Sequence, residues 1–115
     1  IELLERAQLA AADPAAVVTP LRSPTDRPVL TVVDHGDDSY AMNSSLPRLT
    51  HGQTYQLWRV DTTGVAAAVA LGPHPDATEF SLPSGVTGFV LTVERRPAPS
   101  RPTLPAIATS AGAPP

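Results

Sequence analysis

The sequence predicts an all-β protein: an antiparallel β-sandwich of about seven or eight short strands, with one short helix at its N-terminus. The 14 prolines and 7 glycines are spread through the 115 residues, which favours short strands joined by sharp turns. From Ala15 onward the apolar residues alternate with a period of two, as in strands with one buried face. A chain of this length supports one domain with its own core, without disulfides or a metal.

The helix is expected over residues 1–12, where good helix formers place apolar side chains along one stripe. Asp13-Pro14 ends this pattern, because the residue before a proline avoids the helical region. A helix of about a dozen residues is marginal in water on its own. It therefore either packs on the domain or continues from an upstream segment.

Strands follow in order, separated by turns rich in proline, glycine and aspartate. The first is a short edge strand over residues 15–19, which Pro20 ends, and residues 21–27 form a polar loop. The next two strands, residues 29–33 and 40–46, are joined by the turn that begins at His35. This spacing predicts a hairpin.

Residues 53–60 predict a central strand that is covered on both sides, because Tyr55 and Leu57 lie on one face and Trp58 on the other. The remaining strands are expected at residues 65–71, 78–82 and 89–94, with a last edge strand within residues 103–109. Such a series is typical of an immunoglobulin-like sandwich, here over residues 15–109, followed by a flexible proline-rich tail at residues 110–115.

Charge and cysteine content exclude several classes of partner. The formal net charge is −3, and the eight basic residues are all arginines, scattered singly except for one adjacent pair. Nucleic-acid-binding modules carry a clustered basic face, so we expect no nucleic-acid partner. The absence of cysteine excludes disulfides and cysteine-based zinc sites. The longest uninterrupted apolar run, residues 65–71, is far shorter than the ~20 residues of a membrane span.

No metal site or catalytic centre is expected from the polar residues. The three histidines, His35, His51 and His74, lie in three different predicted turns. Asp34, Asp37 and Asp38 could hold calcium, but they lack the alternating ligands and terminal Glu of a calcium loop.

Catalysis by carboxylates or by a serine lacks a supporting motif. Glu79 and Glu94 with Asp61 or Asp76 could form a carboxylate pair. Ser81, Ser84 or Ser100 could pair with a histidine as a nucleophile, but no Gly-x-Ser-x-Gly context surrounds them. We therefore expect no enzymatic activity, no catalytic residue and no cofactor.

One ordered series of motifs identifies a family resemblance. Residues 46–58 read LPRLTHGQTYQLW, followed by LPSG at residues 82–85, LTVE at 91–94 and a proline-rich run at 97–104. This series, which spans nearly the whole chain, resembles the extracytoplasmic C-terminal domain of anti-sigma-K factors. The signature positions are Leu46, Pro47, Leu49, Gly52, Tyr55, Leu57 and Trp58. We interpret them as structural, with core packing of Trp58 favoured over stacking on a ligand.

The resemblance implies a single-pass bacterial membrane protein. Its cytoplasmic N-terminal domain, with a His/Cys zinc-type motif, would capture a sigma factor, and regulated intramembrane proteolysis would release that factor. Residues 1–14 would be a stalk helix next to the membrane, and residues 15–109 an extracytoplasmic sensor domain that controls a site protease. We expect the sigma-binding domain and the membrane helix upstream of Ile1. The signal, or ligand, of this domain stays open.

A second function, from a different class, is a secreted β-sandwich that acts in adhesion or carbohydrate binding. An exposed row of aromatic side chains on one sheet would favour it, because sugars stack on such rings.

Overall fold

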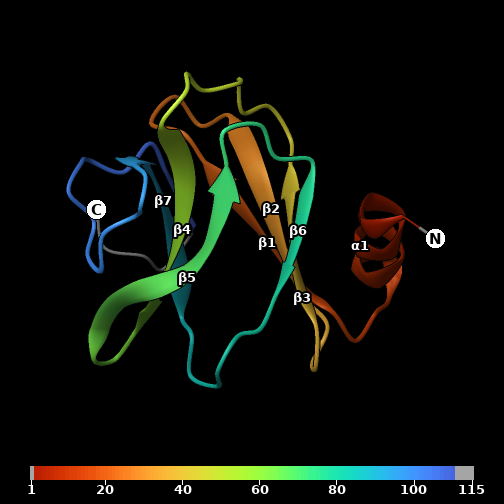
Figure 1. The fold of residues 1–115 in the computed structure, drawn as a ribbon. Helices are drawn as coiled ribbons and strands as arrows, with labels where there is room; N and C mark the ends of the chain where they lie inside the picture. The colour runs from red at the N-terminus through yellow and green to blue at the C-terminus, as the bar shows by residue number, and fades with distance from the viewer. Residues whose placement is uncertain (1, 111–115) are drawn as a thin grey trace.

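A computed structural model describes residues 2–110 and shows one helix and eight antiparallel strands in that part of the chain (Figure 1). The elements are α1 (Leu3–Ala12), β1 (Val17–Arg22), β2 (Pro28–Asp34), β3 (Ser39–Asn43), β4 (Gln53–Asp61), β5 (Gly64–Gly72), β6 (Ala77–Phe80), β7 (Gly88–Arg95) and β8 (Ala108–Thr109). Their order in the sheet is β5-β4-β7-β8-β1-β2-β3-β6.

The sheet folds over on itself so that its two halves face each other across the core (Figure 1). One half is β5-β4-β7, the other is β1-β2-β3-β6, and the two-residue strand β8 bridges them. On the opposite side β5 and β6 contact each other, so the sandwich is nearly a closed barrel. This architecture, all-β with one short N-terminal helix, confirms the predicted fold class.

The main core lies between the two halves and consists of alternate residues of the facing strands. One half contributes Leu21, Leu30, Val32 and Ala41, and the other contributes Tyr55, Leu57, Leu71, Phe89 and Leu91. Burial of this apolar surface is the main term that stabilises the fold.

The outer face of β4 is buried as well, as the sequence predicts. Trp58 is completely buried there and packs with Val60 and Val90. Residues 96–107, which we call the C-terminal strap, pass outside β4 and β7 before the chain re-enters the sheet as β8 (Figure 1). The strap is tied to β7 at its far end, where the Ile107 amide donates to the carbonyl of Leu91 at 2.8 Å.

The predicted end of the first strand at Pro20 is wrong, and the two strands predicted as edges are not edges, since β1 lies between β8 and β2 and β8 lies between β7 and β1. Strand β1 continues through Pro20 to Arg22, and Leu21, predicted in a loop, is completely buried. Pro20 is in register with Thr31 of β2, but β8 pairs with β1 only at Arg22, so no strand pairs with Pro20 on its other side and the missing N–H is tolerated there. Of the predicted tail, residues 111–115 lie outside the described residues.

The pairing of β4 with β5 departs from simple alternation. The register shifts between Tyr55 and Gln56 and again between Leu57 and Trp58, so β5 contains extra residues opposite β4. Such bulges change which face a side chain occupies. Ala68 and Val69 are neighbours that simple alternation would place on opposite faces, yet both pack against the main core.

We predict that Trp58→Ala lowers the free energy of unfolding by about 3–5 kcal/mol, because it leaves a large cavity beneath the strap. Thermal denaturation measures this change. Val65→Ala, at a 38% exposed position of β5, serves as the control and should change stability by less than about 0.5 kcal/mol. An unchanged melting temperature for Trp58→Ala would contradict the packing role of the indole.

Candidate functional site

The signature segment begins as a loop that is fixed to the neighbouring loop between β5 and β6. The Leu46 amide donates to the Asn43 side-chain carbonyl at 2.7 Å, and the Asn43 side-chain amide donates to the Pro75 carbonyl at 2.9 Å. The Leu49 amide donates to the Pro73 carbonyl at 2.8 Å. Leu46 is buried and Leu49 half-buried, both against the main core, so the segment has little freedom to move.

The second half of the signature turns the chain into β4. Gly52 has a φ of +85°, a conformation in which residues with a side chain are strained. Its carbonyl accepts from the Arg96 amide at 2.9 Å. The hydroxyl of Tyr55, whose pKa is raised by burial, donates to the Pro47 carbonyl at 2.5 Å. Tyr55 thus fills the core with its ring and fastens the preceding loop with its hydroxyl.

A buried polar network connects Trp58 to the strap. The Trp58 indole N–H donates to the Thr92 hydroxyl at 2.8 Å, and that hydroxyl donates to Glu94 Oε2 at 2.6 Å. From the strap, the Thr103 hydroxyl donates to Glu94 Oε1 at 2.5 Å and the Thr103 amide donates to Oε2 at 3.3 Å. A single carboxylate therefore joins β7, β4 and the strap.

Glu94 is ionised in this setting although only 1% of it is exposed. Burial raises the pKa of its carboxyl, but the hydrogen bonds from Thr103 and Thr92 outweigh that effect and hold the pKa below its ordinary value of 4.5. A buried carboxylate depends strongly on its hydrogen-bond donors. Loss of these donors would leave a charge buried without hydrogen bonds, which costs several kcal/mol.

Helix α1 lies on the outside of the sandwich, against β2, β3 and β6 (Figure 1). The centre of its contact face is built from small residues: Ala7 and Ala10 are both buried and pack against Val33 and Tyr40, with Leu3 and Ala11 partly buried beside them. The helix therefore approaches the sheet closely but buries little apolar area. Its remaining surface, including Leu9 at 63% exposure, faces solvent.

Polar contacts fix the two ends of α1 on the sandwich. Arg6 forms an ion pair with Glu79 of β6 at 3.6 Å. At the other end, His35 Nε2 donates to Asp13 Oδ2 at 2.6 Å, and this hydrogen bond, with a second one from the Ala15 amide, lowers the pKa of Asp13. Arg6, Asp13 and His35 line an open depression of about 310 Å³ between the helix and Tyr40.

The structure does not bring the other candidate residues together. His35 bonds to Asp13, whereas His51 and His74 are exposed in two other loops. Within residues 2–110, no group of three or more His, Asp or Glu side chains is arranged to hold a metal ion. Asp34 instead accepts from the Gly36 amide and the Ser39 hydroxyl and so stabilises its own turn. Glu79 and Glu94 have separate partners, Arg6 and Thr103.

Sequence reasoning missed two features of this surface. The role of Glu94 was detectable in principle. Val90, Thr92 and Glu94 alternate along β7 and so share its outer face, and the paired strand β4 has Trp58 on that same face. Its main partner, Thr103, was not detectable, because the strap has no regular secondary structure or periodicity. The docking position of α1 was also hidden, since Tyr40 and Glu79 lie far from it in the sequence.

We predict that Glu94→Gln lowers the free energy of unfolding at pH 7 by about 1.5–3 kcal/mol, the usual worth of hydrogen bonds to a charged group. Because the folded-state pKa of Glu94 is lowered, its contribution is complete above pH 4.5 and is lost as the pH falls through the folded value. Urea denaturation at several pH values should show wild type and variant converging below pH 4.5.

Glu79→Gln is the control, because that side chain is 36% exposed and its ion pair with Arg6 is screened by solvent. A Glu94→Gln defect that stays constant from pH 7 to pH 3 would contradict an ionised Glu94.

The aromatic side chains do not form an exposed row. Tyr40, Tyr55, Trp58 and Phe89 are buried, and Phe80 is half-buried. No helix among residues 2–110 has the length and apolar content needed to cross a membrane. Comparison with curated proteins gives no match, and comparison with solved structures gives none either.

A family match accounts for the ordered motifs. Residues 2–106 match the family described as anti-sigma-K factor rskA, C-terminal, so the match covers α1, the sandwich up to β7 and nearly all of the strap. Members of this family are regulatory and have a sigma factor as partner. The chain therefore belongs to the anti-sigma-K factor C-terminal family and is the regulatory domain of an anti-sigma factor.

Proposed function

We propose that this chain is the extracytoplasmic sensor domain of a single-pass membrane anti-sigma factor and controls, without catalysis of its own, the proteolysis that releases the sigma factor. In this proposal a cytoplasmic domain upstream binds the sigma factor and a membrane helix follows it. Residues 1–14 then form the stalk next to the membrane, and the sandwich over residues 15–109 decides whether a site protease can cleave that stalk.

The observation that carries the proposal is the docking of α1 on the sandwich. Ten residues of helix are too few to be stable in water alone, so α1 depends on its contact with β2, β3 and β6. A protease requires an opened, extended segment, and its rate follows the population of the open form when reclosing is fast. A docked α1 is accordingly a protected stalk.

The residues that join α1 to the sandwich suit a contact that opens and closes reversibly. Ala7 and Ala10 bury little area, and the two polar contacts of Arg6 and Asp13 lie at partly exposed positions. The free energy of opening α1 is therefore much smaller than that of unfolding the whole sandwich, as is usual for elements that move in regulation. A ligand or partner that binds the undocked form better would shift this equilibrium towards cleavage.

We also propose that the signature residues Leu46, Pro47, Leu49, Gly52, Tyr55, Leu57 and Trp58 have a structural role and do not bind the signal. The side chains of Leu46, Leu49, Tyr55, Leu57 and Trp58 face the two cores, and the polar groups of Tyr55 and Trp58 bond within the domain. Pro47 and Gly52 are exposed, and their carbonyls accept from the Tyr55 hydroxyl and the Arg96 amide. The alternative function in adhesion or carbohydrate binding has no supporting observation, since the large aromatic rings are buried.

We predict that Ala7→Glu increases cleavage within α1, because a carboxylate at this completely buried position forces the helix off the sandwich. Limited proteolysis with thermolysin, with fragments identified by mass spectrometry, measures the rate. Gln8→Glu is the matched control: it adds the same group one residue later, at an exposed position of the same helix.

Equal cleavage rates in the helix for Ala7→Glu, Gln8→Glu and wild type would show that docking does not protect the stalk. The reading frame upstream of Ile1 tests the wider proposal. A sigma-binding domain and a membrane span there would support it, and a cleavable signal peptide would support the secreted adhesion module instead.

A further inference from the structure

The arginines gather at one end of the sandwich. Four segments meet there, at the upper end in Figure 1: the β1–β2 turn, the loop between β3 and β4, the β5–β6 loop and the end of β7. They carry Arg22, Arg27, Arg48, Arg95 and Arg96, together with His51 and His74, against the surface carboxylates Asp26 and Asp76 and the buried Glu94, which bonds to Thr92 and Thr103. We call this surface the arginine end.

The opposite end has the reverse charge. The strand ends and turns there carry Asp34, Asp37, Asp38 and Asp61, and the nearby arginine of β4, Arg59, lies close enough to Asp61 to help lower the pKa of that carboxyl. Arg101 of the strap lies beside that end, next to Gly64 and Val65 of the β4–β5 turn. The domain is thus polarised along its strands although its net charge is only −3.

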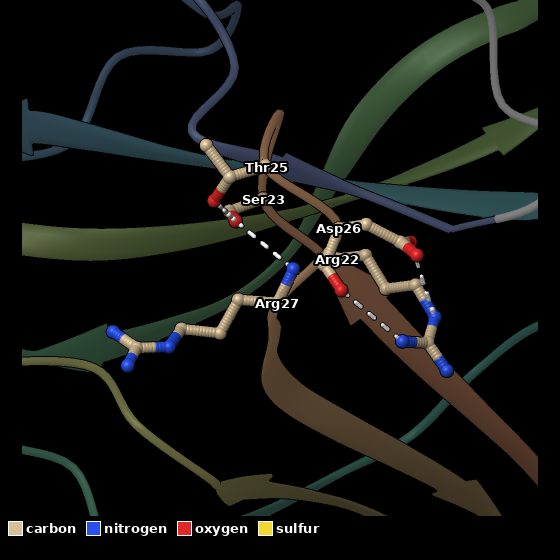
Figure 2. Close-up of polar contacts among 5 residues, drawn as sticks. All are labelled: Arg22, Ser23, Thr25, Asp26 and Arg27. Atoms are coloured by element: carbon tan, nitrogen blue, oxygen red, sulfur yellow. Dashed lines mark hydrogen bonds and ion pairs between the residues drawn. The ribbon is translucent and has the colours of Figure 1, made fainter.

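The arginine end lacks internal partners for its charges. Within residues 2–110, Arg22 alone among its five arginines forms an ion pair, with Asp26 at 3.9 Å. Figure 2 shows how the β1–β2 turn is held by its own bonds: the Ser23 hydroxyl accepts from the Arg27 amide at 3.2 Å, and the Arg22 guanidinium donates to the Asp26 carbonyl at 3.4 Å. The Arg27 guanidinium points away from the turn with no contact drawn to it.

The shape of this end also fits small anionic groups. A depression of about 350 Å³ between Arg95, Arg96 and His51 is lined otherwise by Thr50, Gly52 and Gln53. Guanidinium groups bind phosphate through paired hydrogen bonds. None of the large exposed apolar side chains, Leu4, Leu9, Val17, Val18, Val65 and Leu104, lies in the loops of the arginine end. The surface therefore suits charged headgroups and not an apolar partner.

The course of α1 shows which way this end faces. Arg6, in the first half of α1, forms its ion pair with Glu79, which is paired with Tyr40 in the sheet. Asp13, directly after the helix, bonds to His35 in the β2–β3 turn, which belongs to the acidic end. The helix therefore runs towards the acidic end, and its beginning at Leu3 lies towards the arginine end. Glu2, directly before α1, and Glu5, in its first turn, lie at the side of the sandwich and not in the loops of the arginine end.

We propose that the arginine end docks on the phosphate headgroups of an anionic membrane surface. The proposal rests on the proposed function, in which a membrane helix precedes α1 and brings this end to the bilayer. Each arginine near such a surface strengthens binding about fivefold at moderate ionic strength. Docking would hold the domain against the membrane, with α1 along the side of the sandwich (Figure 1), and would add to the protection of the stalk by limiting access to it.

The test is co-sedimentation of the 115-residue chain with vesicles of phosphatidylcholine, alone or mixed with phosphatidylglycerol. We expect binding only to the mixed vesicles, and its loss in about 1 M salt, where the screening length falls to ~3 Å. Arg95→Gln and Arg27→Gln should each weaken binding about fivefold. Arg101→Gln makes the same change in net charge at the other end and should leave binding within about twofold, because screening limits its reach.

Arg95→Lys should retain binding, which separates loss of charge from misfolding. Equal binding to both kinds of vesicle, or equal weakening by Arg95→Gln and Arg101→Gln, would overturn the proposal. Binding to soluble polyphosphate without binding to vesicles would also overturn it. Failure here would leave the proteolysis result for Ala7→Glu untouched, so this proposal and the proposed function can fail separately.

Discussion

Strand β4 has to bury both of its faces, and the rest of the domain is arranged to satisfy that requirement. Its inner face meets the opposite half of the sheet through Tyr55 and Leu57. Its outer face carries the completely buried Trp58, and the strap passes on the outer side of β4 and β7 (Figure 1) and is linked to the indole through Thr92 and Glu94. The ionised Glu94 fastens the strap at that place through Thr103. Fold closure thus depends on a buried indole and a buried carboxylate acting together.

The same architecture separates a stable part from a readily opened part. The sandwich is held by long interdigitated strands, whereas α1 rests on its outer side through the buried Ala7 and Ala10, the partly buried Leu3 and Ala11, and two partly exposed polar contacts. Because α1 contributes little to the main core, it can leave without unfolding the sandwich. The control of proteolysis that we propose needs such a difference, since it requires α1 to be protected until a signal arrives.

Most strands could be predicted from local sequence, because alternation and turn residues are local signals. The burial of β4 on both faces could be predicted, because Tyr55 and Trp58 are three residues apart and therefore point to opposite faces of the strand. The continuation of β1 through Pro20 was not, because it depends on β8 pairing only at Arg22. The bulges that bring Ala68 and Val69 to one core arise from the partner strand. The charge polarity was hidden because its arginines are adjacent only after the chain has folded.

The central claim is that α1 is held by the sandwich, and hydrogen exchange of the α1 backbone amides tests it most directly. A ten-residue helix that is free in water exchanges at nearly the rate of an unfolded peptide. Our account predicts clear protection of the α1 amides in wild type, smaller than that of β4. In Ala7→Glu, α1 should lose its protection while β4 keeps it. Fast exchange of the α1 amides in the wild-type domain would contradict the account.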